Sequence, residues 1–150
     1  MIAVIQRVSK ARVEIDKQNK AEIGEGLLIL LGITHNDSAE DIEWLSSKIV
    51  NLRIFDDENG VMNLSCLDKK ADIIVVSQFT LHARTKKGNR PSYIDAARPE
   101  QAIPLYESFI KHTENLIEKS VQSGVFGANM LVELCNTGPV TIIIDSKNRI

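Results

Sequence analysis

Apolar and polar positions along this chain predict a β-rich protein with two helices. Ile2–Ile15 has β-prone character, with successive side chains on opposite faces of a strand. Leu27–Ile33 and Ile73–Phe79 are continuous apolar runs, which are typical of buried strands. We expect three further strands near the end of the chain, over Val121–Phe126, Leu131–Cys135 and Val140–Ile144.

Apolar residues recur at helical spacing in two segments. Ser38 is expected to cap the first helix, with Asp41 favouring its start. Pro99 predicts the start of a second helix that reaches about Lys119, and Pro104 falls in its early turns, where proline is tolerated. The apolar positions that define the two helices are Ile42, Leu45, Ile49 and Leu52, then Ile103, Tyr106, Phe109, Ile110 and Ile117.

Two glycine-containing pairs interrupt β-prone segments. Asn59-Gly60 predicts a hairpin turn between Leu52–Phe55 and Val61–Leu64. Gly138-Pro139 is less ordinary, because proline removes a ladder donor and is confined to an edge, a bulge or a strand start. Glycine there lets another backbone or a ligand approach closely. This pair is therefore either a turn or a recognition device.

Composition indicates an ordinary globular protein. A chain of 150 residues, 43% hydrophobic and 25% charged, suits one domain over 1–150, with 145–150 as a charged tail. No apolar run approaches the roughly 18 residues of a membrane span, and Met1–Arg7 lacks the order of a signal peptide. We expect a cytoplasmic protein with no membrane partner. Cys66 and Cys135 form no CxxC pair, so both are expected to be buried thiols.

The charge pattern contains one local imbalance. The net charge of -2 argues against indiscriminate nucleic-acid binding. Arg84, Lys86, Lys87 and Arg90 nevertheless put four positive charges and no negative one into a short stretch. This stretch is either a solvated loop or a phosphate-contacting loop, and composition leaves the choice open.

Familiar catalytic signatures are missing from the sequence. There is no Gly-x-Ser-x-Gly elbow, Walker A loop, HExxH or Gly-x-Gly-x-x-Gly. His35, His82 and His112 are far apart in sequence, so we expect neither a metal nor a cofactor. Strand alternation predicts that Thr80 and His82 share a face, where His82 would activate a Thr80 nucleophile. The alternative is a strand-end hydroxyl that satisfies backbone groups.

Four segments, taken in order, are more specific than any single motif. They are Ser77–Thr80, Gly88–Tyr93, Gly124–Met130 and Asn136–Thr141. In this order and spacing they resemble the D-aminoacyl-tRNA deacylase family of the bacterial and eukaryotic type, formerly called D-tyrosyl-tRNA deacylase. The resemblance runs from Ile5 to Ile144, with departures at His82 and Tyr93 and in the tail.

The resemblance implies both a fold and an activity. It implies a mixed α/β, β-rich single domain in three layers (β/β/α) with two main helices, which forms a homodimer with active sites at the subunit interface. The implied substrate is the aminoacylated 3′ end of tRNA, whose D-aminoacyl ester is hydrolysed to free D-amino acid and tRNA. L-aminoacyl-tRNA is rejected, and Gly-tRNA(Ala) is expected to be accepted because glycine has no side chain to exclude.

The resemblance also assigns roles near the end of the apolar run Ile73–Phe79. Backbone N–H groups around Phe79 and Thr80 would form an oxyanion hole, while Ser77 and Gln78 position the end of the tRNA. The substrate's own ribose hydroxyl would assist hydrolysis, with Thr80 as nucleophile or general base as the rival. Phe126 and Met130 would flank the adenine.

The glycine-proline segment receives the second set of implied roles. The Gly138-Pro139 peptide bond would be cis and would enter the partner subunit's pocket, where its carbonyls accept hydrogen bonds from the α-amino group. An L side chain would collide with this backbone. Arg7 would brace the segment, and Val140 and Thr141 would join it in binding the substrate. Arg84, Lys86, Lys87 and Arg90 are candidate tRNA contacts.

Two other functional classes stay open at this point. One is an RNA-binding module without activity, which would use the basic loop. The other is a Ser/Thr-type hydrolase of small esters, for which Thr80→Ala would abolish turnover.

Overall fold

The strand β1 (Ile2–Ile15) organises the sheet, because it pairs with three other strands in the computed structural model, which describes residues 1–150. Its first half pairs with β3 (Gly26–Gly32) and its second half with β2 (Gln18–Ile23), both antiparallel. Its other edge pairs with β8 (Leu131–Asp145). Beyond β3 the order continues through two parallel strands, β6 (Asp72–Ser77) and β7 (Gln122–Ser123).

The strands β3 and β6 are buried on both faces, which explains their continuous apolar sequences. Leu27, Ile29 and Leu31 belong to the main core, beneath the helices. Leu28 faces the opposite way and joins a second cluster, in which the curved β1–β2 ribbon covers β3 and β6. The other buried members of this second cluster are Val8, Ala11, Val13, Ala21, Ile23, Ile74 and Val76.

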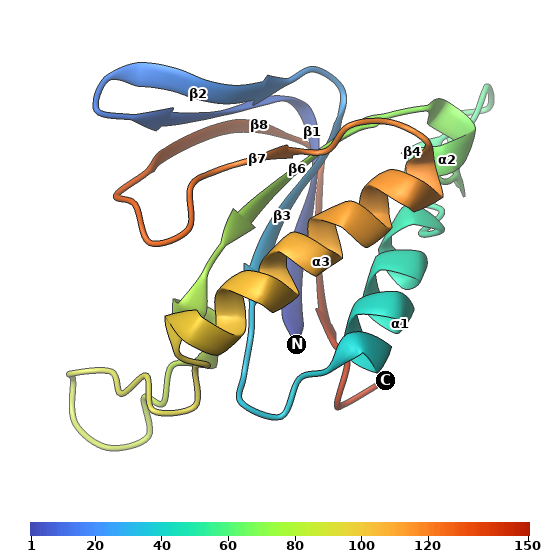
Figure 1. Ribbon diagram of the computed structural model, residues 1–150. Coiled ribbons are helices and arrows are strands. Elements are labelled where there is room, and N and C mark those ends of the chain that lie inside the picture. Colours follow the sequence, from blue (N-terminus) through green and yellow to red (C-terminus); the bar gives the residue numbers. More distant parts are fainter.

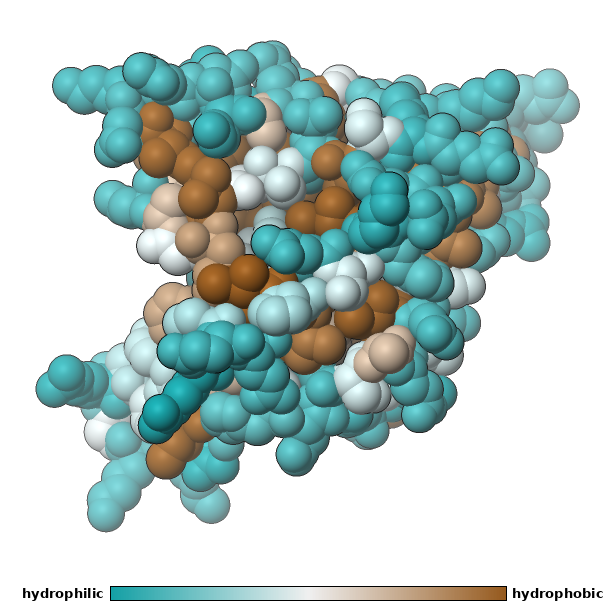
Figure 2. Space-filling view, viewed as in Figure 1, coloured by the Kyte–Doolittle hydropathy of each residue, from teal (hydrophilic) through white to brown (hydrophobic).

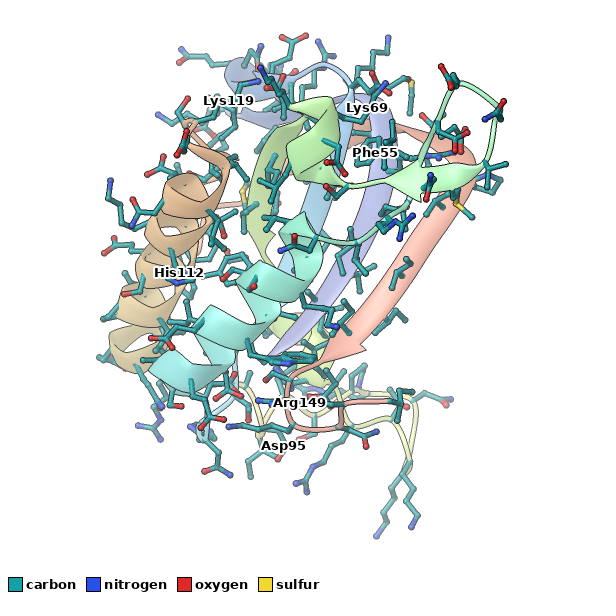
Figure 3. The ribbon with its side chains drawn as sticks, turned by 90° about the vertical axis from the view of Figure 1, so that its right-hand side faces the viewer. Phe55, Lys69, Asp95, His112, Lys119 and Arg149 are labelled. Carbon is teal, nitrogen blue, oxygen red and sulfur yellow. The ribbon has the colours of Figure 1, made fainter.

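Two long helices cover one side of the sheet (Figure 1). The first, α1 (Ala39–Val50), begins with the expected Ser38 cap, reinforced by Asp41 in a capping box. The second, α3 (Pro99–Ile117), begins at Pro99 and tolerates Pro104 in its second turn. They pack together, and His112 Nδ1 lies 2.7 Å from the Ser46 hydroxyl (Figure 3). None of the helices has the length and apolar character needed to span a membrane.

The mixed α/β class is confirmed, but several predicted boundaries are wrong. A third helix, α2 (Cys66–Lys69), joins the two that were predicted; it is a single turn capped by Ser65. The predicted strand over Val121–Phe126 shrinks to the two residues of β7. The two predicted strands over Leu131–Cys135 and Val140–Ile144 form one long strand, β8, because both segments pair with β1.

The predicted hairpin at Asn59-Gly60 is confirmed in a shorter form. It joins β4 (Phe55–Asp56) and β5 (Met62–Leu64), with Gly60 at a φ of 73°. Cys66 is buried as expected, and burial raises the pKa of its thiol to about 11. Cys135 is exposed, because it lies on the outward face of β8, so its predicted burial is wrong.

Candidate active site

A pocket of about 260 Å³ opens at the carboxyl end of β6. Its walls come from the end of β6, the β7–β8 connection and the first part of α3. Figure 2 shows hydrophobic residues gathered beside the indentation between that connection and α3. The candidate residues that line it are Ser77, Gln78, Phe79, Phe126 and Met130. The structure therefore brings together residues that lie about fifty positions apart in the sequence.

The chain turns sharply after Ser77, so the predicted strand alternation through His82 is wrong. β6 ends at Ser77, and Phe79–His82 form a 3-10 helix, η1. The Gln78 N–H donates to the Leu31 carbonyl at 2.8 Å, which ties the turn to β3. Gly32 permits this close packing, since a Cβ there would lie 3.0 Å from the Gln78 carbonyl oxygen.

This turn leaves two backbone donors without acceptors. Phe79 and Thr80 form the first turn of η1, where a helix offers its own N–H groups no internal acceptor. Neither N–H donates to a carbonyl elsewhere in the chain. The Thr80 hydroxyl accepts a hydrogen bond from Gln78 Nε2 at 2.5 Å, and Thr80 itself does not line the pocket. His82 Nε2 is buried and makes no hydrogen bond, so this atom does not engage the Thr80 hydroxyl.

The far wall of the pocket is fixed by an aromatic contact from α3. Tyr106 is buried, and its hydroxyl donates to the Val75 carbonyl at 2.8 Å. Burial raises the pKa of this phenol above its ordinary value. Phe126 meets the Tyr106 ring edge to face, with ring centroids 5.8 Å apart. Tyr106 thus supports a pocket residue, although the sequence indicated only a core position for it.

Gly138 and Pro139 lie in a bulge of the edge strand β8. Val8 pairs with Asn136 and Gln6 pairs with Thr141, so the single residue Arg7 faces four residues, Thr137–Val140. The Asn136 side chain closes the neck of this bulge, because its Nδ2 donates to the carbonyls of Arg7 at 3.0 Å and Val140 at 2.9 Å. Bulge and edge were among the settings expected for this proline.

Arg7 holds the bulge from beneath. Its side chain is buried, and its Nε donates to the Thr137 carbonyl at 3.3 Å. Its Nη1 donates to the Ile54 carbonyl at 2.7 Å and to Asp56 at 3.1 Å, which connects the bulge to β4. A Cβ on Gly138 would lie 2.8 Å from Arg7 Nη2, so a larger residue here would require this guanidinium to move.

The bulge and the pocket are separate places on one chain. Gly138 and Pro139 are exposed, their peptide bond is cis, and neither residue lines the pocket. Val140 packs partly against the main core, and the exposed Thr141 contacts Asn136. Two of the groups that the predicted site residues form are therefore those around the pocket and those around Arg7.

The basic loop forms a third group next to the pocket. Arg84 and Ser92 exchange two backbone hydrogen bonds, of 2.8 and 3.0 Å, that close the loop. Arg84 also pairs with Asp95, and this hydrogen-bonded guanidinium holds the pKa of the Asp95 carboxyl below its ordinary value. No local sequence pattern indicated this pairing across eleven residues. Lys86, Lys87 and Arg90 are exposed.

Comparison with known proteins identifies the family of this chain. The family model described as D-Tyr-tRNA(Tyr) deacylase matches residues 4–145. The chain therefore belongs to this family, and the predicted resemblance is confirmed. No group of three or more potential metal-ligating side chains occurs in the structure.

Individual relatives match nearly the whole chain. A D-aminoacyl-tRNA deacylase of Flavobacterium psychrophilum is 64% identical over 149 residues, which is 99% of both chains. One from Bacteroides fragilis is 62% identical with the same coverage. The solved structure of a c-Myc DNA Unwinding Element Binding Protein is similar at a TM-score of 0.91, with 40% identity over 97% of this chain and 98% of that one.

Proposed function

We propose that this protein is a hydrolase that cleaves the ester between a D-amino acid and the 3′-terminal adenosine of tRNA. Water adds to the ester carbonyl, and the products are the free D-amino acid and tRNA. The observation that carries this proposal is the pocket lined by Ser77, Gln78 and Phe79, in a chain 64% identical to a protein named D-aminoacyl-tRNA deacylase. Such a substrate is found where translation occurs, in the cytoplasm.

The two free amides at the turn supply electrostatic stabilisation. The N–H groups of Phe79 and Thr80 donate to the oxyanion that develops on the ester carbonyl. They are held in place before substrate binds, because Gln78 is bonded to β3 on one side of the turn. Ser77 and Gln78 position the ribose end of the tRNA.

The attack needs no nucleophile from the protein. The Thr80 hydroxyl is engaged by Gln78, and His82 makes no hydrogen bond to it. The substrate's own ribose hydroxyl assists the water instead. Phe126 and Met130, on the far wall, flank the adenine.

Selection against L-amino acids comes from a second copy of the chain. The Gly138 and Pro139 carbonyls of one subunit enter the pocket of the other and accept hydrogen bonds from the substrate's α-ammonium group. An L side chain would collide with this backbone, whereas a D side chain points away from it. The exposed position of the bulge, outside its own pocket, and the brace from Arg7 support this arrangement.

A homodimer also accounts for surface that one chain leaves open. β8 pairs only with β1, so its outer edge carries unpaired backbone groups. Leu131 and Ile143 on this strand are 58% and 70% exposed, which is costly for large apolar side chains in water. Pairing of two copies about a two-fold axis would cover both features.

The same collision argument extends the substrate range to glycine. Glycine carries no side chain, so Gly-tRNA(Ala) is not excluded by this collision.

The tRNA body lies along the basic loop, where Lys86, Lys87 and Arg90 are free to contact phosphates while Arg84 holds the loop closed.

The test compares D-tyrosyl-tRNA with the ethyl ester of D-tyrosine, each incubated with the purified protein. The proposed function predicts rapid release of D-tyrosine from the tRNA and little from the ethyl ester, which lacks adenosine. Efficient cleavage of the ethyl ester would instead identify a small-ester hydrolase. Binding of the tRNA without any hydrolysis would identify an RNA-binding module.

A further inference from the structure

An exposed aromatic pair stands at the mouth of the pocket. Phe79 lines the pocket yet is 55% exposed, and Tyr93 is 40% exposed. Their rings meet edge to face, with centroids 5.0 Å apart and an interplanar angle of 76°. An edge-to-face pair leaves ring faces uncovered, so a third planar group can stack on them.

The structure holds Tyr93 firmly in this place. Tyr93 follows Ser92, whose backbone exchanges two hydrogen bonds with Arg84. The next residue, Ile94, presents its carbonyl to His35 Nε2 at 3.1 Å. The Asp95 carbonyl then accepts a hydrogen bond from the Thr34 hydroxyl at 2.6 Å, and its carboxylate binds Arg84. Tyr93 is therefore part of an ordered stem rather than of a loose loop.

The surroundings of the pair suit a nucleic acid strand. In Figure 1 the ordered segment around Tyr93 belongs to the yellow loop that leaves the end of β6 and returns to the start of α3. Figure 3 shows Asp95, in this loop, at the end of the molecule opposite Lys69 and Lys119. The cations Lys86, Lys87 and Arg90 sit on the same loop, with no acidic residue among them. Exposed aromatic rings next to cations are the combination that binds single-stranded RNA.

We propose that Phe79 and Tyr93 form a stacking site for the base of the nucleotide that precedes the 3′-terminal adenosine. The inference rests on the proposed function, in which the terminal adenosine occupies the pocket beside Phe126 and Met130. The strand leaving that pocket passes Phe79, which belongs to both the pocket and the pair. Stacking tolerates any base, so the site extends binding to the tRNA end without selecting a particular sequence.

The experiment compares two substrates in three proteins: wild type, Tyr93→Leu and Tyr93→Phe. One substrate is D-tyrosyl-tRNA, and the other is the 3′-D-tyrosyl ester of adenosine alone. Tyr93→Leu should lower the ratio of kcat/KM for the tRNA over that for the adenosine ester roughly tenfold, through KM, because one stacked base is lost. Tyr93→Phe keeps the ring and should restore the ratio. Ile94→Ser, in the exposed neighbour, is the matched control and should keep it as well.

Two outcomes would overturn the stacking site. An equal loss on both substrates would mean that Tyr93 only supports the pocket, and a loss of dimer mass in Tyr93→Leu would mean that a partner subunit covers the pair. Binding of uncharged RNA ending in the same nucleotides, measured by fluorescence anisotropy, separates this inference from the proposed function. If the wild type binds this RNA more tightly than Tyr93→Leu does but hydrolyses neither substrate, the proposed function is refuted and the stacking site is not.

Discussion

Arg7 and Thr137 are joined by a hydrogen bond from the buried guanidinium to the carbonyl directly before Gly138. The same guanidinium donates to Ile54 and Asp56, so one side chain holds the glycine-proline bulge against β4. The exposed bulge therefore has a fixed base. Backbone that excludes an L side chain by collision must be held in place, because a mobile backbone would move aside for that side chain.

Arg7→Ala should reduce both stability and turnover. The change leaves the Thr137 and Ile54 carbonyls without their donor, so the free energy of unfolding should fall by about 2–4 kcal/mol. Turnover of D-aminoacyl-tRNA should fall at least about tenfold, as expected when a positioned group shifts by roughly 1 Å. Urea unfolding and a deacylation assay measure the two effects. Arg12→Ala, on the same strand but exposed and paired with Glu133, is the control. Equal behaviour of the two variants would show that the brace is unimportant.

Gly138→Ala should damage the bulge more than its single methyl group suggests. The new Cβ would lie 2.8 Å from Arg7 Nη2 and 2.9 Å from Val140 Cγ2, at a φ of 114° that L residues rarely adopt. We expect a loss of most D-aminoacyl-tRNA hydrolysis, measured as kcat/KM. Gly24→Ala meets no atom within 4 Å and should keep full activity. Full activity in Gly138→Ala would exclude a close backbone approach at this position.

Thr80→Ala should keep measurable activity. The hydroxyl accepts a hydrogen bond from Gln78 and lies outside the pocket lining, whereas the Thr80 N–H survives the substitution. A moderate fall in kcat is expected from the loosened Gln78 side chain. Single-turnover deacylation measures it, with Thr80→Ser as the variant that restores the hydroxyl. Complete loss in Thr80→Ala with rescue in Thr80→Ser would make Thr80 the nucleophile or base.

Asp41 should link stability to acid pH. Burial opposes its ionisation, but hydrogen bonds from Lys147, Ser146 and the Ser38 backbone outweigh burial and hold the pKa of its carboxyl well below the ordinary value. The folded pKa is thus lower than the unfolded one, near 3.9, so this stabilisation is present above about pH 4 and is lost as pH falls further.

The measurement is urea unfolding at pH 7 and pH 3 for the wild type and Asp41→Asn. The wild type should lose more stability between the two pH values than the variant does. Identical losses would mean that Asp41 is not a source of the acid sensitivity.

The sequence predicted local features well, because the responsible residues are neighbours. Ser38 and Asp41 form a cap within one turn, and Asn59-Gly60 forms its hairpin within one loop. The wrong predictions have tertiary causes. β6 ends at Ser77, where its pairing with β3 ends at Leu31 and the chain turns into η1, and no local pattern reveals that partner.

The same difference between local patterns and tertiary contacts applies to the candidate site. The motifs at Ser77–Thr80 and Asn136–Thr141 identified the family, and the family model bears this out. The contacts of Arg7 with Ile54 and Asp56 depend on how β1 meets β4, so spacing along the chain could not supply them. Tyr106 was predicted only as a core residue, because its contact with Phe126 forms when α3 packs on the sheet.

We expect this protein to distinguish the chirality of the aminoacyl group. The most direct measurement is the deacylation rate of D-tyrosyl-tRNA and of L-tyrosyl-tRNA, prepared on the same tRNA and incubated with the purified protein. The D ester should be hydrolysed faster by at least about a hundredfold, the ratio expected for a clash worth about 3 kcal/mol. Equal hydrolysis of both esters, or of neither, would show that this protein does not select for D-aminoacyl-tRNA.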